Sequence, residues 1–155
     1  MTCVRNGEEK DLSEILALIK ELAKYEKSEN EVETTIESMK LDFSGEAKLF
    51  DFLVAEIDGL LIGTAIYFYT YSTWKGKTLY LEDIVVKEDY RRFGAGTMLF
   101  NELVSIAKKE KVKRMSWQVL DWNEPAILFY KKINANFDST WINCKLTFEQ
   151  IQRYP

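Results

Sequence analysis

The chain has 155 residues, a formal net charge of −4 and a pI near 5.1. An acidic chain of this kind lacks the basic face on which nucleic-acid binding depends, so we expect no nucleic-acid partner. It contains no histidine, which excludes a histidine-based catalytic triad and an imidazole metal site. Any general base must therefore be a carboxylate, a tyrosine, a lysine or a water molecule that these hold.

We predict one domain over residues 1–155, because no linker, repeat or low-complexity tract interrupts the sequence. The longest apolar run, around Leu60 to Tyr69, falls far short of the roughly 20 residues needed to cross a bilayer. Cys3 and Cys144 are isolated and lack metal-type spacing, which suits a reducing compartment. We therefore expect a soluble cytoplasmic protein with no membrane partner and no bound metal.

The first half of the chain predicts two helices followed by a hairpin. Apolar residues recur at helical spacing over roughly residues 7–27, and Glu33–Lys40 is typical of a shorter second helix. The β-rich runs Leu49–Ile57 and Leu60–Tyr71 follow, joined by Asp58-Gly59. An Asp-Gly pair between two such runs is the strongest short hairpin signal, so these runs are predicted to be antiparallel strands.

The second half of the chain alternates between strand and helix patterns. With the hairpin strands first and strand-helix-strand units later, this order predicts an α+β domain with a mixed central sheet flanked by about four helices. Asn134 is typical of a left-handed residue just after a helix. The elements predicted here are a strand at Thr78–Val86, a helix from near Gly96 to the basic cluster at 108–111, a strand at Arg114–Leu120, a helix begun by Asn123 and Pro125, and one or two closing strands within Phe137–Thr147.

The most informative stretch is Arg91-Arg92-Phe93-Gly94-Ala95-Gly96, which joins the predicted strand at Thr78–Val86 to an amphipathic helix. Glycines at 94 and 96 let the backbone approach phosphate oxygens, and the first-turn amides and the helix dipole then face the anion. The stretch is not a dinucleotide fingerprint, because Leu99 stands in place of the third glycine. The pattern alone is compatible with a pyrophosphate cradle and with a plain tight turn carrying solvated arginines.

Further segments extend this pattern along nearly the whole chain: Leu18–Glu26, Tyr71–Gly76, Tyr80–Val86, Val119–Asn123 and Asp121–Lys132. Together with the glycine stretch they resemble the GNAT superfamily of acetyl-CoA-dependent N-acetyltransferases, in which Arg-x-x-Gly-x-Gly/Ala holds the CoA pyrophosphate. Within it, the chain looks like the spermidine/spermine acetyltransferase family and leans toward its thialysine-acetylating branch. The resemblance implies a single GNAT-type domain, acetyl-CoA as co-substrate and a homodimer.

For the cofactor, we predict that the amides of Phe93–Thr97 and the side chains of Arg91 and Arg92 hold the pyrophosphate. The resemblance adds the end of the preceding strand, Asn123 and Lys132. Asn123 is equally compatible with a plain helix cap. The complete predicted set is Ile84, Val85, Val86, Arg91, Arg92, Phe93, Gly94, Ala95, Gly96, Thr97, Asn123 and Lys132.

For catalysis, a primary amine of pKa about 10 is almost wholly ammonium at pH 7, so a group must remove a proton before the amine attacks. The resemblance assigns this role, acting through water, to Glu82; the alternative is a solvated strand-edge carboxylate or one that only holds the cation. Because strand residues alternate, Glu82 and Asp83 are expected on opposite faces. For the departing thiolate, the resemblance makes Tyr130 the proton donor, the alternative being a core tyrosine whose hydroxyl reaches solvent.

A cationic acceptor is best held by carboxylates and aromatic faces. Ser72 stands where polyamine-acetylating members carry an aspartate, and Phe137-Asp138-Ser139-Thr140 replaces an acidic segment of those members. The resemblance therefore favours a small amine such as thialysine, lysine or a diamine over spermidine and spermine. Acetylation of polyamines or of a protein amino group, and a CoA-binding sensor without turnover, are the alternatives. The predicted acceptor-binding residues are Glu26, Glu29, Tyr71, Trp74 and Asp83.

Overall fold

The computed structural model describes residues 1–155 of the chain, except for the side chain of Arg92. The chain forms two compact units, Met1–Gln118 and Val119–Pro155. The N-terminal unit contains a sheet with helices on both of its faces, and the C-terminal unit contains two short helices.

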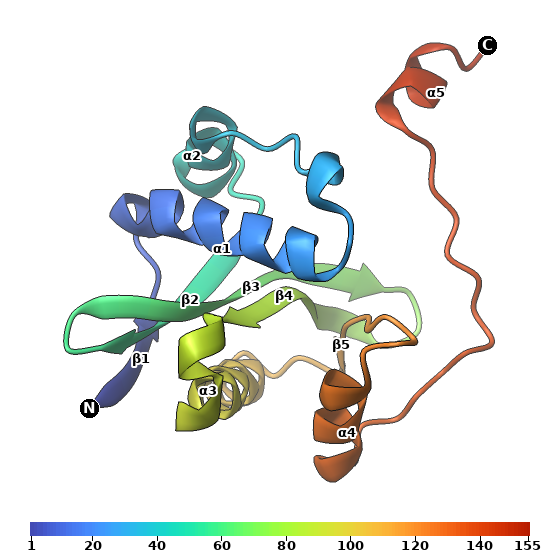
Figure 1. Cartoon of the computed structure of the whole chain (residues 1–155). Coiled ribbons are helices and arrows are strands. Elements are labelled where there is room, and N and C mark those ends of the chain that lie inside the picture. The colour runs from blue at the N-terminus through green and yellow to red at the C-terminus, as the bar shows by residue number, and fades with distance from the viewer. The chain divides into compact units, whose positions relative to one another are not determined.

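A five-stranded mixed sheet forms the centre of the N-terminal unit (Figure 1). The strands lie in the order β1-β2-β3-β4-β5, and neighbours are antiparallel except for the parallel pair β4 and β5. The predicted α+β class with a mixed sheet is therefore confirmed. The strands span Thr2–Asn6 (β1), Asp51–Ile57 (β2), Leu60–Ser72 (β3), Gly76–Val86 (β4) and Met115–Ser116 (β5).

Helices cover both faces of this sheet, with α1 and α2 on one face and α3 on the other (Figure 1). The apolar residues of α1 recur three and four positions apart, so that Leu12, Ile15 and Leu16 are buried together. They form a core cluster with Phe52 and Val85 of the sheet. The helices of this unit span Leu12–Tyr25 (α1), Ile36–Ser44 (α2) and Ala95–Lys109 (α3), with short 3-10 helices at Glu9–Asp11 (η1), Glu29–Glu31 (η2) and Glu88–Phe93 (η3).

An ion-pair network fixes the N-terminal end of α1. Arg5 of β1 donates two hydrogen bonds to the carboxylate of Asp11, at 2.8 and 3.0 Å, and also bonds to Glu56 of β2. The hydrogen bonds from Arg5 hold the pKa of Asp11 below its usual value, because they favour the ionised carboxylate. The start of α1 is thereby tied to two strands, and the far end of the same helix contributes to the candidate site.

Two predictions about turns are confirmed. Asp58 and Gly59, which join β2 to β3, have φ values of +49° and +82°. Positive φ at both central residues is the type I′ hairpin geometry that an Asp-Gly pair favours. Asn134 has a φ of +59° after the end of α4 (Glu124–Lys132), where the amide of Ala135 donates to the carbonyl of Tyr130 at 3.0 Å.

Several boundaries differ from the prediction. β1 was not predicted, because five mixed polar and apolar residues give no clear alternation. α2 begins at Ile36 because Thr35 caps it, its hydroxyl accepting the amide of Ser38 at 3.1 Å. The strand predicted at Arg114–Leu120 is reduced to the two residues of β5, which pair with Leu79 and Tyr80.

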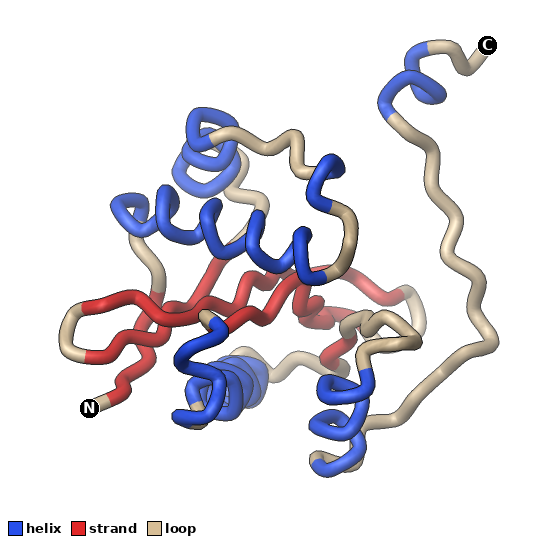
Figure 2. Tube along the Cα trace, in the orientation of Figure 1, coloured by secondary structure: helices blue, strands red, loops and turns tan.

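The closing strands predicted within Phe137–Thr147 are wrong. This segment of the C-terminal unit has no regular structure and follows α4 as a loop (Figure 2). Its alternating composition suits a strand, but a strand forms only within a sheet, and the described sheet consists of β1 to β5, none of which lies in this segment. A short helix, α5 (Phe148–Gln152), follows, capped by the hydroxyl of Thr147.

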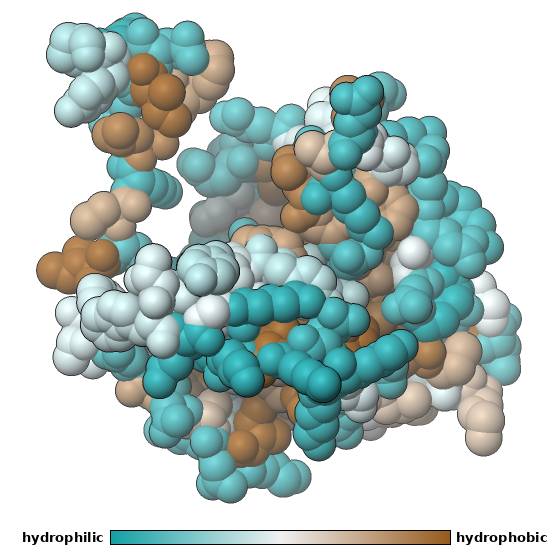
Figure 3. All heavy atoms as spheres, turned by 180° about the vertical axis from the view of Figure 1, so that it is seen from behind, coloured by the Kyte–Doolittle hydropathy of each residue, from teal (hydrophilic) through white to brown (hydrophobic). Residues whose placement is uncertain are grey.

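Apolar side chains of the C-terminal unit are largely exposed. Tyr130 is the only buried side chain among residues 119–155. Trp141, Ile142 and Phe148 are all more than two-thirds exposed, and brown apolar spheres gather on α5 at the upper left of Figure 3. Within the described part of the chain, no helix has the length and hydropathy needed to cross a membrane.

Gly63 of β3 offers a test of how closely β3, β4 and α3 pack. A Cβ at this position would lie 2.9 Å from the carbonyl oxygen of Val85 and 3.0 Å from Cγ2 of Val86. We expect Gly63→Ala to lower the free energy of unfolding by about 1–3 kcal/mol, because backbone must shift to admit the methyl group. Gly96→Ala is the matched control, since its Cβ would meet its nearest neighbour at 3.8 Å. Equal urea midpoints for the two variants would contradict this packing.

Candidate active site

A β-bulge interrupts the pairing of β3 and β4 at Glu82. Ile66 pairs with Asp83 and Tyr67 pairs with Leu81, which leaves Glu82 without a cross-strand partner. Strict alternation therefore fails at this point, because Leu81 and Asp83 pair with adjacent residues of β3 and so lie on opposite faces although they are two positions apart. The expectation that Glu82 and Asp83 occupy opposite faces stays a prediction. Beyond the bulge, Asp83 shares a face with Val85, two residues later, which belongs to the core cluster under α1.

Three carboxylates influence one another where the bulge meets the end of α1. The pKa of Asp83 is raised to about 6, first by burial and then by the negative charges of Glu82 and Glu26. Glu26, the C-cap residue that follows α1, also has a raised pKa because it is partly desolvated. Glu82 is exposed. We call Glu26, Glu82 and Asp83 the acidic cluster; a positive charge placed among them would relieve their repulsion.

The predicted turn at Gly94-Ala95-Gly96, which we call the glycine turn, is confirmed as the start of a helix. Gly94 has a φ of +75° and is the N-cap of α3, which begins at Ala95. A Cβ at Gly94 would meet no described atom within 4 Å, and one at Gly96 would meet only Val86, at 3.8 Å. The first amides of an α-helix lack acceptors within the helix, so those of Ala95, Gly96 and Thr97 can donate hydrogen bonds to an anion. The open glycine surface and these amides fit a pyrophosphate.

Arg91 lies beside this turn in η3 and is held by two groups. Its Nε donates to the carbonyl oxygen of Val86 at 3.2 Å, and its guanidinium lies 5.2 Å from the centre of the Tyr25 ring. Arg91 thus carries a positive charge next to the amides at the start of α3. The predicted partner Arg92 has a side chain that lies outside the described residues.

Residues 13–135 match the family model of the acetyltransferase (GNAT) family. The chain belongs to the GNAT family. It is 37% identical over 140 residues to a thialysine N-epsilon-acetyltransferase from Bos taurus, covering 85% of this chain and 82% of that protein. It is also 37% identical over 139 residues to the human spermidine/spermine N(1)-acetyltransferase-like protein 1, covering 85% of this chain and 20% of that protein.

Solved structures of other proteins have the same fold as this chain. An integron cassette protein from V. cholerae superposes with a TM-score of 0.79 at 18% identity, covering 97% of this chain and 95% of that one. At this identity the match concerns the fold alone. GNAT enzymes use acetyl-CoA as co-substrate, and the glycine turn and Arg91 are the features of the N-terminal unit that fit its pyrophosphate.

The side chains of the other predicted cofactor residues in the N-terminal unit differ in how far they are exposed to solvent. Val85 and Val86 are buried and Ile84 is half-buried, which leaves their backbone groups as the main polar features of the strand end. Phe93 is exposed, and its ring lies 6.1 Å from that of Tyr90. Roles for these residues in holding acetyl-CoA stay predictions.

Three predicted site residues lie in the C-terminal unit. The amide oxygen of Asn123 accepts the backbone N–H of Ala126 at 3.4 Å, so the helix-cap role is present. Tyr130 is buried, and burial raises its pKa, so its phenol stays protonated at neutral pH. Lys132 is exposed in the last turn of α4. Participation of these three residues in acetyl transfer stays a prediction.

The predicted acceptor residues do not form one group. Tyr71 and Trp74 are 79% and 82% exposed at the tip of the β3–β4 hairpin. Tyr71 pairs with Lys77, six residues before Asp83 on β4, so the tip lies roughly 20 Å from the acidic cluster. At this tip the hydroxyl of Ser72 accepts the amides of Trp74 and Lys75, at 3.3 and 3.2 Å, so Ser72 caps the turn.

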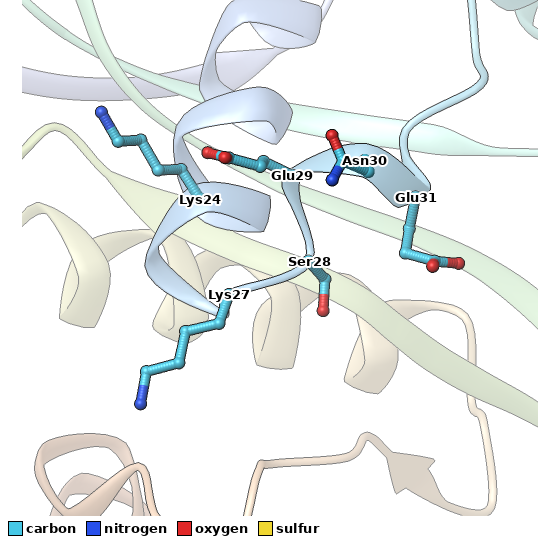
Figure 4. Close-up of a pocket in the computed structure, with 6 residues that line it drawn as sticks. All are labelled: Lys24, Lys27, Ser28, Glu29, Asn30 and Glu31. Carbon is cyan, nitrogen blue, oxygen red and sulfur yellow. The ribbon is translucent and has the colours of Figure 1, made fainter.

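Glu29 lines an open hollow of about 510 Å³ just beyond the end of α1 (Figure 4). The ammonium groups of Lys24 and Lys27 point to one side of this region and the carboxylate of Glu31 to the other. The lining therefore mixes both charges and does not by itself select a cation. The hollow is lined by Lys24, Lys27, Ser28, Glu29, Asn30 and Glu31.

Sequence reasoning missed two features of the site. Tyr25 was given no role, although it directly precedes Glu26 and contacts Arg91 through its ring. The bulge at Glu82 was also missed, because nothing in Leu81-Glu82-Asp83-Ile84 departs from an ordinary strand pattern. An aromatic residue beside a predicted acidic ligand was the available signal for the first feature.

Gly96→Val tests the glycine turn without straining it. Gly94 is unsuitable because its φ of +75° disfavours any side chain, whereas Gly96 lies in the first turn of α3 with open space beside it. We expect Gly96→Val to weaken CoA binding by at least about tenfold, because the side chain would fill the space beside the helix-start amides. Calorimetric titration with CoA measures this. An unchanged dissociation constant in a variant with the wild-type melting temperature would remove the turn from the cofactor site.

Proposed function

We propose that this enzyme transfers the acetyl group of acetyl-CoA directly to the primary amine of a small molecule of the thialysine or lysine type, or to a diamine. The observation that carries the proposal is the acidic cluster at the end of α1. Glu26 of this cluster directly follows Tyr25, whose ring contacts Arg91 beside the glycine turn. The glycine turn with Arg91 offers a site for an anion, and the neighbouring acidic cluster offers a site for a cation. This pair of sites suits a reaction between an anionic cofactor and a cationic acceptor. Acetyl-CoA supplies the activated acetyl group as a thioester.

In this proposal the acidic cluster holds the acceptor's ammonium group and promotes loss of its proton. Glu82 accepts that proton through water, and Asp83 and Glu26 supply the negative charge that attracts the cation. Tyr130 stays protonated because it is buried, which suits a proton donor to the departing thiolate. Both cysteines, Cys3 and Cys144, are exposed and lie outside the sequence motifs that resemble the family, so the proposal is direct transfer without an enzyme thioester.

The choice of acceptor rests on Ser72 and on the relatives. By the family resemblance, Ser72 stands where polyamine-acetylating members carry an aspartate, and in this chain its hydroxyl caps the hairpin turn. The bovine relative is named for thialysine, which favours an acceptor with one amine at the end of a short chain. The human relative is named for spermidine and spermine, so polyamines are the second candidate class.

A panel of acceptors tests the proposal. Thiol release from acetyl-CoA would be measured with thialysine, lysine, putrescine, spermidine and a basic peptide. We expect the highest kcat/KM with thialysine or lysine. Preference for spermidine would replace the proposal with the polyamine alternative, and preference for the peptide would make the chain a protein acetyltransferase. Tight CoA binding without thiol release from any acceptor would make it a CoA-binding sensor.

Asp83 gives the proposal a pH signature. With a pKa of about 6, Asp83 is ionised above that pH and protonated below it, so the acceptor's KM should rise as the pH falls below about 6. Asp83→Asn should raise the acceptor's KM by at least about tenfold at pH 7.5 and remove this dependence between pH 5 and 7. Steady-state kinetics over this range measures both effects.

Glu82→Gln is the matched comparison, because it removes the neighbouring charge. It should keep the acidic limb of the KM profile but move its midpoint below pH 6, since the charge of Glu82 is one cause of the raised pKa of Asp83. If Glu82 is also the base, kcat/KM of this variant should recover partly as the pH approaches the pKa of the amine.

For Asp83→Asn, a profile of acceptor KM against pH that runs parallel to that of the wild type would exclude Asp83 from acceptor binding.

Tyr130→Phe tests the proton donor. The variant keeps the ring and its edge-on contact with Phe129, at 5.5 Å between ring centres, but removes the hydroxyl. We expect kcat to fall roughly 10²-fold with little change in acetyl-CoA binding. Tyr67→Phe is a burial-matched control, because Tyr67 and Tyr130 are each 6% exposed. Equal kcat values for the two variants would remove Tyr130 from the chemistry.

The family resemblance also leads us to propose that residues 1–155 act as one GNAT domain, as a homodimer in the cytoplasm. The match of the family model to residues 13–135, which extends into both units, supports a single domain. The exposed aromatic side chains of the β3–β4 hairpin are compatible with a dimer. Sedimentation equilibrium measures the mass directly, and a monomer at micromolar concentration would exclude the dimer.

A further inference from the structure

Tyr25 and Arg91 meet although 66 positions separate them in the sequence. Tyr25 is the last residue of α1, and Arg91 lies in η3, just before the glycine turn. The guanidinium carbon of Arg91 lies 5.2 Å from the centre of the Tyr25 ring. This is within the roughly 6 Å at which a cation is attracted to the face of an aromatic ring.

The contacts of Arg91 leave one part of its guanidinium available. Nε is used by the carbonyl of Val86, at 3.2 Å, and the guanidinium also contacts the Tyr25 ring. Among the described residues, no hydrogen bond is made by either terminal nitrogen of Arg91. These two nitrogens carry the donors that bind phosphate oxygens in pairs. The protein thus holds the guanidinium through Nε and the Tyr25 ring, and its two terminal nitrogens remain available to bind an anion.

We infer that Tyr25 is a positioning residue for Arg91, which it holds in the orientation that binds the cofactor's pyrophosphate. An arginine side chain loses considerable rotamer freedom on binding an anion, and the ring reduces that loss by restricting the side chain beforehand. The inference rests on the proposed function, since it takes the glycine turn as the pyrophosphate site. It adds a residue of α1 to a site otherwise formed by β4, η3 and α3.

The position of Tyr25 also joins the two halves of the proposed site. Glu26 of the acidic cluster is the next residue, and its backbone N–H donates to the carbonyl of Leu22 at 2.8 Å in the last turn of α1. Movement of Tyr25 toward or away from Arg91 therefore moves the backbone that carries Glu26. A variant that releases Arg91 is thus expected to affect cofactor affinity first and acceptor KM to a smaller extent.

A double-mutant cycle on CoA affinity tests the inference. Calorimetric titration with CoA would be done on wild type, Tyr25→Leu, Arg91→Ala and the double variant. We expect Arg91→Ala to weaken binding by at least about tenfold, because charge-assisted hydrogen bonds to phosphate are lost. Tyr25→Leu should weaken it by about two- to fivefold in the presence of Arg91, and should have no effect when Arg91 is absent.

Tyr25→Phe is the conservative variant that separates positioning from general structure. It keeps the aromatic face and should bind CoA as wild type does. Equal losses from Tyr25→Leu with and without Arg91 would overturn the inference while leaving the glycine turn as the cofactor site. Unchanged binding in Arg91→Ala would instead contradict the proposed role of Arg91. Loss of affinity in Tyr25→Phe equal to that in Tyr25→Leu would also overturn the inference, because the hydroxyl and not the ring face would then be responsible.

Discussion

The left-handed conformation of Gly94 determines where the first amides of α3 point, and the proposed cofactor site depends on it. Val85 and Val86 bury the strand on one side of the turn, and Leu99 and Leu103 bury the helix on the other. Between these two packed elements the chain passes through η3 and enters α3 at Gly94, where a φ of +75° carries no Cβ penalty. The core thus fixes both ends of the turn, and the amides remain open.

The acidic cluster works against stability. The carboxyl of Asp83 has its pKa raised from 3.8 to about 6 by burial and by neighbouring charges, so the folded chain releases this proton at higher pH than the unfolded chain. Stability from this group is fully present below pH 4 and is lost as the pH rises through about 6. Such a group lowers stability at neutral pH by about 3 kcal/mol, which a bound ammonium group would offset. This balance favours a binding role for Asp83 over a structural one.

Local patterns predicted the parts of the fold that local chemistry decides. Asp58-Gly59, the Asn123 cap and the left-handed Asn134 all have the predicted geometry. Features that depend on distant partners could not be predicted: the bulge at Glu82 is defined only by its pairing with β3, and the contact of Tyr25 with Arg91 joins separate elements. At Phe137–Thr147 the sequence pattern predicted strands that the structure does not contain, because a strand-like composition forms a strand only within a sheet.

The central claim is that the amides at the start of α3 bind the cofactor's pyrophosphate. Residue-resolved hydrogen exchange by NMR, with and without CoA, tests it most directly. We expect CoA to slow exchange of the amides of Ala95, Gly96 and Thr97, which have no acceptor within the helix. The corresponding amides of Ile36 and Glu37 at the start of α2 are the internal control and should not change. Binding of CoA without protection at residues 95–97 would contradict the claim.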